Sequence, residues 1–392
     1  MDRKYDTPLS VVCCVIFLLL NMSVVDSSII KPRLYDGTVN QLGRYSFTFD
    51  AYDHISARDN PSVIAIGSSR MREIFDGGLI GNLSNAEYDF FNLAYGMDLP
   101  YIRMIEIHEL IISSPGLVII EIGPSTFSQL DPSVNHYNRT MQFMAHLMSM
   151  KPHIAEPEWF DIIDEKDEKY LPMNFQKQKV HWSSYGRESF EATIGYELFG
   201  NNQPFDCGPL IGHVRCVPFG IEEQEYEGYL RYPHQLPNVL ASVKSTGTII
   251  NSNGNPYSMP LEKYYGTYLE KRLNHSYHNP EGNYNKNHAA LDFILSNLIE
   301  HDVNVLLVGL PYNPVFLSRL APGQWDYVNQ SLALYNQNPH LHVVDYTWDT
   351  DWVDDDFSDL AHAARDGEIL FAEKIVRTID EILLFDGERQ SE

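Results

Sequence analysis

Short apolar runs alternate with amphipathic stretches in two parts of the chain. The runs are unbroken and rich in Val, Ile and Leu, which is typical of strands buried on both faces of a sheet. They span 62–67, 88–95, 116–123, 303–311 and 341–346. Amphipathic helices are predicted to begin near Ser69 and to span 99–112, 287–302 and 363–384. This alternation predicts an α/β protein with a doubly wound, parallel five-stranded sheet.

The interval 128–286 lacks this alternation of apolar runs and amphipathic stretches. It contains a Met-rich helical stretch and many Tyr, Gly and Asn residues. We interpret it as a large insertion after the third strand that forms a lid or subdomain over the active face, because loops there determine specificity. The alternative is a purely structural elaboration. The α/β domain then consists of 27–127 and 287–392, and residues 27–60 are expected to pack on its outside.

The N-terminal segment, residues 1–26, contains an apolar run from Leu9 to Val25, preceded by Arg3 and Lys4. This pattern predicts a signal peptide or an uncleaved signal anchor. No clear Ala-x-Ala cleavage site follows, which favours the anchor. In either case the bulk of the chain is expected outside the cytoplasm, membrane-anchored or secreted. Five Asn-x-Ser/Thr sequons would permit glycosylation there.

Two cysteines, Cys207 and Cys216, lie close together within the interval, in a segment that contains Gly and Pro. In an oxidising compartment they are expected to form a disulfide that closes a short loop. Two free thiols are the alternative.

The formal charge of −25 and the pI near 4.9 argue against a nucleic-acid partner, because phosphate binding needs clustered Lys and Arg. An acidic loop from Asp349 to Asp359 offers hard oxygen ligands for Ca²⁺, but its spacing fits no EF-hand and a solvated loop is the favoured interpretation. The histidines have no metal-ligand spacing. We therefore expect neither a metal nor a cofactor.

Two motifs that follow predicted strands contain residue types used in catalysis. Gly67-Ser68-Ser69-Arg70 follows the first strand, and a strand-to-helix turn there presents a Ser hydroxyl at the carboxyl edge of the sheet. Asp359-Leu360-Ala361-His362 follows the last strand. An Asp three residues before a His can orient and polarise the imidazole, which then serves as base towards the Ser. In a 2-1-3-4-5 strand order the two motifs can meet.

These motifs resemble the sequence blocks of the SGNH (GDSL-like) hydrolase superfamily. Besides G-x-S and D-x-x-H followed by Gly367, the chain has an N-L-x-x-G-like segment from Asn92 to Gly96 and a Gly123-Pro124-Ser125 segment after the third strand. The blocks occur in the family's order over 60–127 and 287–384. The resemblance implies a flavodoxin-like sheet of the SGNH type.

The resemblance also implies roles for individual residues. Ser69 would be the nucleophile, His362 the general base and Asp359 its orienting partner. The oxyanion hole would use the amides of Ser69 and Gly96 together with the position of Ser125.

Two further polar residues of the matched blocks are candidates for substrate binding. Asn92 begins the second block. Arg70, and Arg72 beyond it, would clamp an anionic group or else lie exposed on the first helix.

Two departures distinguish the chain from the usual family pattern. Ser125 replaces an Asn amide donor worth about 3 kcal/mol of transition-state stabilisation in comparable oxyanion holes. Gly96 also stands one residue closer to Asn92 than is common. In these departures the chain resembles divergent, membrane-anchored branches of the superfamily that modify cell-envelope polymers. The departures imply slow hydrolysis of simple esters.

The leading hypothesis is an extracytoplasmic serine esterase or O-acyltransferase acting on acyl groups of cell-surface glycans or lipids. The sequence leaves open whether water or a sugar hydroxyl accepts the acyl group. The alternative is a non-catalytic SGNH-fold surface protein that binds glycan or an envelope partner. A Ser69 hydroxyl within reach of His362, itself held by Asp359, favours catalysis.

Overall fold

The computed structural model describes mainly the two parts of the chain that alternate strands and helices. The described residues are 11, 51–52, 55–85, 87–94, 98–127, 205–206, 215–216, 249–250, 256–257, 285–357 and 360–389. The expected N-terminal segment, apart from Val11, and most of 128–286 lie outside them. Within the described ranges, no helix is both long and apolar enough to cross a membrane.

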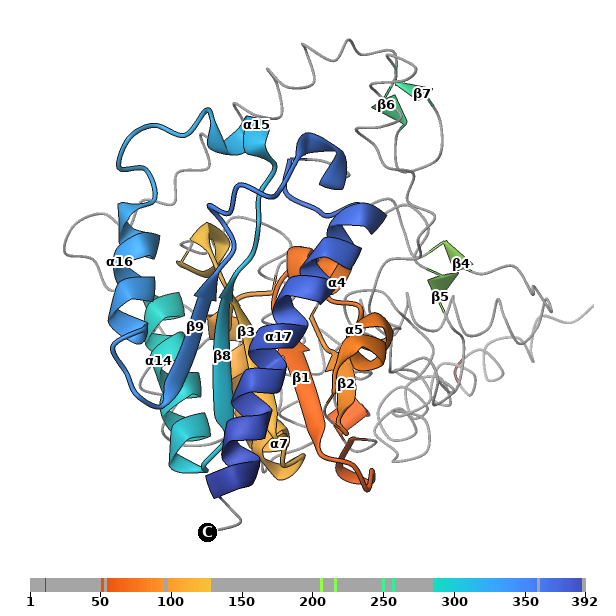
Figure 1. The fold of residues 1–392 in the computed structure, drawn as a ribbon, viewed down its shortest axis with the longest axis vertical. Helices are drawn as coiled ribbons and strands as arrows, with labels where there is room; N and C mark the ends of the chain where they lie inside the picture. Colours follow the sequence, from red (N-terminus) through yellow and green to blue (C-terminus); the bar gives the residue numbers. More distant parts are fainter. Residues whose placement is uncertain are drawn as a thin grey trace, which may run out of the picture.

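One parallel sheet of five strands has the order β2-β1-β3-β8-β9. The strands are β1 (Ser62–Ile66), β2 (Asp89–Asn92), β3 (Leu117–Ile122), β8 (Asn304–Gly309) and β9 (Leu341–Asp345). Every residue of β1 and β3 is buried, because helices cover both faces of the sheet (Figure 1). The predicted α/β fold with a five-stranded parallel sheet in the order 2-1-3-4-5 is confirmed.

The two faces of the sheet carry different helices because side chains of a strand alternate between the faces. Val63 and Ala65 of β1 pack with the helices α4 (Ser69–Ile74), α5 (Gly77–Leu83) and α17 (Arg365–Arg389). Ile64 and Ile66 face the opposite layer. That layer consists of α6 (Pro100–Arg103), the 3₁₀ turn η2 (Met104–Glu106), α7 (Ile107–Ile112), α14 (Lys286–Glu300) and α16 (Asp326–Tyr335).

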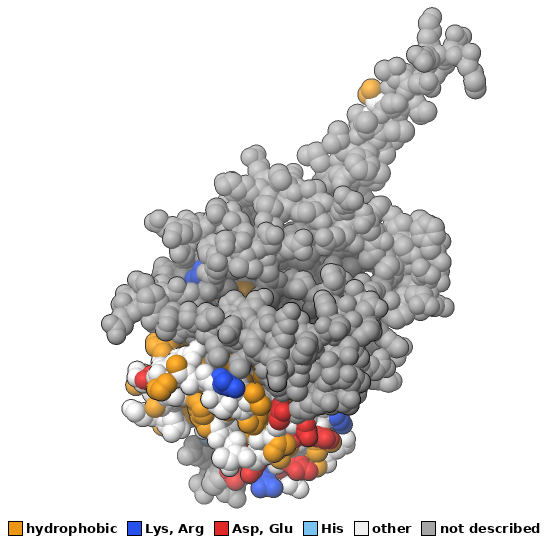
Figure 2. Space-filling model, turned by 90° about the horizontal axis from the view of Figure 1, so that it is seen from above, with side chains coloured by type: hydrophobic (Ala, Val, Ile, Leu, Met, Phe, Trp, Pro, Cys, Tyr) orange, Lys and Arg blue, Asp and Glu red, His pale blue; other side chains and the backbone are white. Residues whose placement is uncertain are grey.

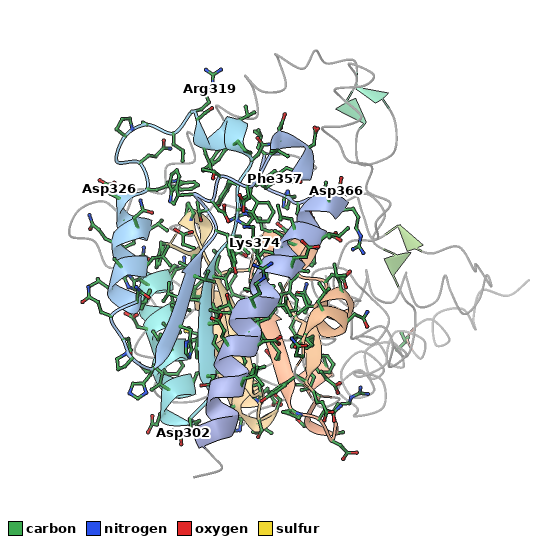
Figure 3. All side chains as sticks on the ribbon, viewed as in Figure 1. Asp302, Arg319, Asp326, Phe357, Asp366 and Lys374 are labelled. Atoms are coloured by element: carbon green, nitrogen blue, oxygen red, sulfur yellow. The ribbon has the colours of Figure 1, made fainter. Side chains whose placement is uncertain are left out.

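Helix α17 shows how the pattern of apolar residues determines this packing. Phe371, Ile375 and Ile379 recur every four residues, and each is fully buried against the sheet. Their spacing places them on one face of a 3.6-residue helix. The helix starts beside the carboxyl edge of the sheet, where Figure 3 shows Asp366 near Phe357.

Several helices differ from the prediction. The single helix predicted over 99–112 is divided into α6, η2 and α7. The prediction also missed α5, α15 (Pro314–Leu317) and α16. Helix α5 contains three glycines, which are poor helix formers, and its start depends on Asp76, whose carboxylate accepts the Leu79 amide.

The segment preceding β1 was expected to pack on the outside of the domain, and this was wrong for three of its described residues, whereas most of 56–60 is exposed. Ala51, Tyr52 and Ile55 are buried in the same core as Ile64. The Tyr52 hydroxyl donates a hydrogen bond to the buried Glu106 carboxylate. The segment therefore completes the core beneath α6 and α7.

Between 128 and 284 the residues that the structure describes form two short antiparallel strand pairs, and these do not belong to the parallel sheet. They are β4 (Phe205–Asp206) with β5 (Arg215–Cys216), and β6 (Ile249–Ile250) with β7 (Pro256–Tyr257). Cys216 ends β5, whereas Cys207 lies outside the described residues, so the disulfide stays a prediction.

Candidate active site at the carboxyl edge of the sheet

The turn between β1 and α4 presents Ser69. Ser68 is the N-cap of α4, and its hydroxyl accepts the Arg70 amide at 3.2 Å. Ser69 is then the first residue of the helix. Gly67 is required for close approach, since a Cβ there would lie 2.7 Å from the Glu121 Cβ and 2.9 Å from the Met71 Cβ. Ser68 therefore stabilises the turn, and Ser69 carries the half-buried hydroxyl at the site.

His362 lies in the loop between Asp356 and α17, called the His362 loop below, and the two ends of this loop are held together. The Ala364 amide donates to the Asp356 carbonyl at 2.7 Å, and Phe357 forms an antiparallel bridge with Ala363. Gly367 permits this closure, because a Cβ there would collide with the Asp356 carbonyl. Backbone contacts thus hold the two ends of the loop together before α17 begins.

The loop is also anchored from the side. Leu360 and Ala361 are buried in a small apolar cluster with Tyr312, Phe316 and Trp325, which follow β8. Ring centroids of Tyr312 and Trp325 lie 4.9 Å apart. His362 itself remains half-buried beside this cluster.

The structure brings Ser69 and His362 together although 293 positions separate them in the sequence. The Ser69 Oγ lies 2.9 Å from the His362 Nε2, a hydrogen-bond distance. In a serine triad the histidine likewise meets the serine through Nε2, and its Nδ1 contacts the orienting carboxylate. The arrangement can abstract a proton from the serine hydroxyl.

Other predicted site residues are described in part or not at all. Asp359 and Gly96 lie outside the described residues. Ser125 lies in the 3₁₀ turn η3 (Pro124–Phe127), of which only the backbone at that position is described. The third member of the triad and the oxyanion donors therefore stay predictions.

Arg70 is buried, so its expected exposure on the first helix is wrong. Its Nε donates to the Ala361 carbonyl at 3.2 Å, and its Nη2 to the carbonyls of Leu310 and Pro311 at 2.9 and 2.7 Å. Its Nη1 lies 3.4 Å from the Glu121 carboxylate. The guanidinium is directed at protein groups.

Arg72 was likewise considered as an exposed residue or an anion clamp. It is buried too, with 3% of its surface exposed.

The side chain of Asn92 is also buried and bonds with backbone groups. It is 1% exposed, and its side-chain amide donates to the carbonyls of Met71, Arg72 and Phe75 at the end of α4. Its carbonyl accepts the Ala94 amide at 3.1 Å. The side chain thus ties the end of β2 to the helix that begins with Ser69.

Two buried acids of the domain, one of them beside Ser68, were missed by the sequence analysis. Glu121 stands within the apolar run of β3 and accepts the Ser68 amide at 2.6 Å. Glu106 bonds with Arg103 and Tyr52, and its pKa is raised by burial, against the lowering effect of Arg103. A carboxylate inside an otherwise apolar strand was the available signal for Glu121, because a buried charge needs a partner.

A second buried arginine organises the neighbouring strand end. Arg103 donates to the Asp98 carboxylate at 2.8 Å and to the Leu93 carbonyl at 2.8 Å. Asp98, Arg103 and Glu121 line a small hollow of about 30 Å³ that reaches Gly67 and Ser68. Neither Ser69 nor His362 lines it.

Three carboxylates in the described part of the acidic loop contact protein groups. Asp349 and Asp351 accept from the Lys374 ammonium, and Asp354 accepts from the Asn313 amide. Among the described residues, no group of three or more His, Cys, Asp or Glu could hold a metal ion. On the described part of the face in Figure 2, acidic and hydrophobic side chains gather, with basic side chains scattered among them.

Comparison with known proteins adds no relative. The sequence matches no protein-family model and has no significant match among curated proteins.

Proposed function

We propose that the chain is an SGNH-type serine esterase or O-acyltransferase. The observation that carries the proposal is the 2.9 Å contact between the Ser69 Oγ and the His362 Nε2 at the carboxyl edge of the sheet. Ligands of doubly wound sheets bind at this edge. The strand order and the sequence blocks that resemble the superfamily support the same assignment.

The proposed reaction proceeds through an acyl-enzyme. The Ser69 oxygen attacks the carbonyl carbon of an ester while the His362 Nε2 takes the hydroxyl proton. The resulting imidazolium, oriented by Asp359, returns that proton to the departing alcohol. Water or an acceptor hydroxyl then attacks the carbonyl carbon of the acyl-Ser69 ester and gives its proton to His362. His362 passes this proton to the departing Ser69 oxygen, which releases the acyl product and restores the free enzyme.

The proposed substrates are acyl groups on cell-surface glycans or lipids. This class rests on the apolar N-terminal run, which predicts an extracytoplasmic location, and on the likeness to envelope-modifying branches of the superfamily. It includes both esterase and transferase outcomes, because they share the acyl-enzyme and differ in the acceptor.

Labelling with a fluorophosphonate probe tests the proposal. We expect the wild-type protein to be labelled on Ser69, as located by peptide mass spectrometry, and Ser69→Ala to be unlabelled. His362→Gln should also lose labelling while retaining the wild-type melting temperature. Ser331→Ala is a matched control, since its hydroxyl bonds only within α16 to the Tyr327 carbonyl among the contacts described.

Labelling that survives in Ser69→Ala but disappears in Ser68→Ala would transfer the nucleophile to the neighbouring serine. A wild-type protein that resists labelling throughout, although folded, would contradict the serine-enzyme proposal.

A further inference from the structure

We propose that Arg70 and Glu121 are positioning residues that hold Ser69 and His362 at hydrogen-bond distance from each other. This inference rests on the proposed function and adds to it how the catalytic pair is aligned. Ser69 and His362 come from segments with no chain connection near the site, so their contact requires a separate support.

Arg70 links the two segments directly. It follows Ser69 in α4, and its Nε donates to the carbonyl of Ala361, the residue before His362. The same guanidinium therefore restrains the residues next to both catalytic groups. Displacement of either segment would break this hydrogen bond.

Arg70 also holds the loop to the sheet. Its Nη2 donates to the Leu310 and Pro311 carbonyls just beyond β8, and its guanidinium carbon lies 3.5 Å from the centre of the Tyr312 ring. Tyr312 packs in the cluster that contains Ala361. Three segments, α4, the end of β8 and the His362 loop, thus meet on one side chain.

Glu121 holds the turn that carries Ser69. Its Oε2 accepts the Ser68 amide at 2.6 Å, and its Oε1 lies 3.4 Å from the Arg70 Nη1. Both side chains are almost fully buried, at 6% and 2% exposure. The acid therefore compensates the buried arginine and orients the turn that carries Ser69.

The geometry requires arginine and not merely a positive charge. A guanidinium presents several donors in one rigid plane, whereas a lysine ammonium is a compact charge on a flexible stem. Lys at position 70 would keep a charge for Glu121 but would not reach the Ala361, Leu310 and Pro311 carbonyls together. Arg70→Lys is therefore the informative substitution.

The experiment measures fluorophosphonate labelling of the full-length protein at several probe concentrations. We expect Arg70→Lys to reduce the limiting labelling rate by roughly 10- to 100-fold, since a misplacement of about 1 Å has effects of this size. The probe concentration at half-maximal rate should stay close to that of the wild type. A merely structural role would instead lower the labelled fraction at an unchanged rate.

Arg365→Lys is the matched control. Arg365 lies in the first turn of α17, where it pairs with Asp76 and Glu368, and makes no described contact with the His362 loop. Its labelling rate should equal that of the wild type. Glu121→Gln provides a second reading, because it keeps an acceptor for the Ser68 amide but removes the charge that orients Arg70.

Hydrogen exchange provides a readout that does not depend on catalysis. In Arg70→Lys, peptides that contain Ala361 and His362 should exchange faster, while peptides from β3 and α14 keep wild-type protection. Unchanged exchange in the loop would overturn the proposal even if the protein proved not to react with the probe. An unchanged limiting rate in both Arg70→Lys and Glu121→Gln would overturn it in a protein whose Ser69 is labelled.

Discussion

Replacing Asn92 with Leu removes the side chain that joins the end of β2 to the end of α4. The amide has two hydrogens, shared among the carbonyls of Met71, Arg72 and Phe75 at 3.3, 3.1 and 2.7 Å, and its oxygen accepts the Ala94 amide. Leu has a similar size but offers no donor or acceptor. The substitution therefore leaves polar backbone groups buried without this partner.

The magnitude follows from these contacts. Each buried polar group left unsatisfied costs about 1–3 kcal/mol, and two donor bonds and one acceptor bond are lost. Added apolar burial offsets a part, so Asn92→Leu should lower the free energy of unfolding by about 3–5 kcal/mol. For a domain of this size that corresponds to roughly 10 °C in melting temperature.

Urea unfolding followed by tryptophan fluorescence measures this effect, since Trp325 and Trp352 are buried in the domain. Asn60→Leu is the matched control, because Asn60 is exposed and its amide lies 3.4 Å from the Asp89 carboxylate. A stability of Asn92→Leu within about 0.5 kcal/mol of the wild type, the range of ordinary surface substitutions, would refute the bridging role. Loss of probe affinity at unchanged stability would instead indicate substrate contact.

Three further predictions concern Gly67, Glu106 and Lys374. Gly67→Ala places a Cβ 2.7 Å from the Glu121 Cβ, so we expect a loss of about 1–3 kcal/mol in urea unfolding and slower probe labelling. The pKa of Glu106 is raised by burial, so its folded form keeps a proton that the unfolded chain releases, and stability should fall as pH rises above 4.5. Glu106→Gln should remove this slope, and parallel slopes in the two proteins would contradict it. Lys374, labelled on α17 in Figure 3, lowers the pKa of Asp349, and Lys374→Met should cost less than about 1 kcal/mol at neutral pH. This small loss should shrink as pH falls below 3.8 and through the lower pKa that Asp349 has in the folded state, because the carboxyl is then protonated in both states. A loss independent of pH would argue against the ion pair.

The sheet could be predicted from the sequence because its signal is local. Strands buried on both faces are apolar at nearly every position, and the runs that became β1, β3 and β8 show this directly. Because the strands could be recognised, the turn motif at Ser69 and the segment containing His362 could be placed after strands as well. Alternation of strands and helices then limited the strand order, so the meeting of the two motifs was foreseeable.

The short helices were not foreseeable from periodicity. Helix α5 is rich in glycine, and the 99–112 stretch has one amphipathic pattern although η2 divides it. Boundaries of this kind depend on caps and on packing against neighbouring elements, which override intrinsic propensity.

The burial of the polar residues around the site was decided by tertiary structure alone. Arg70 belongs to a short amphipathic stretch that the sequence places equally well on a surface. Its partners Leu310 and Ala361 lie 240 and 291 positions away, and only the folded sheet brings their carbonyls beside α4. A charged side chain is buried where such distant acceptors satisfy its donors, and no local pattern records their presence.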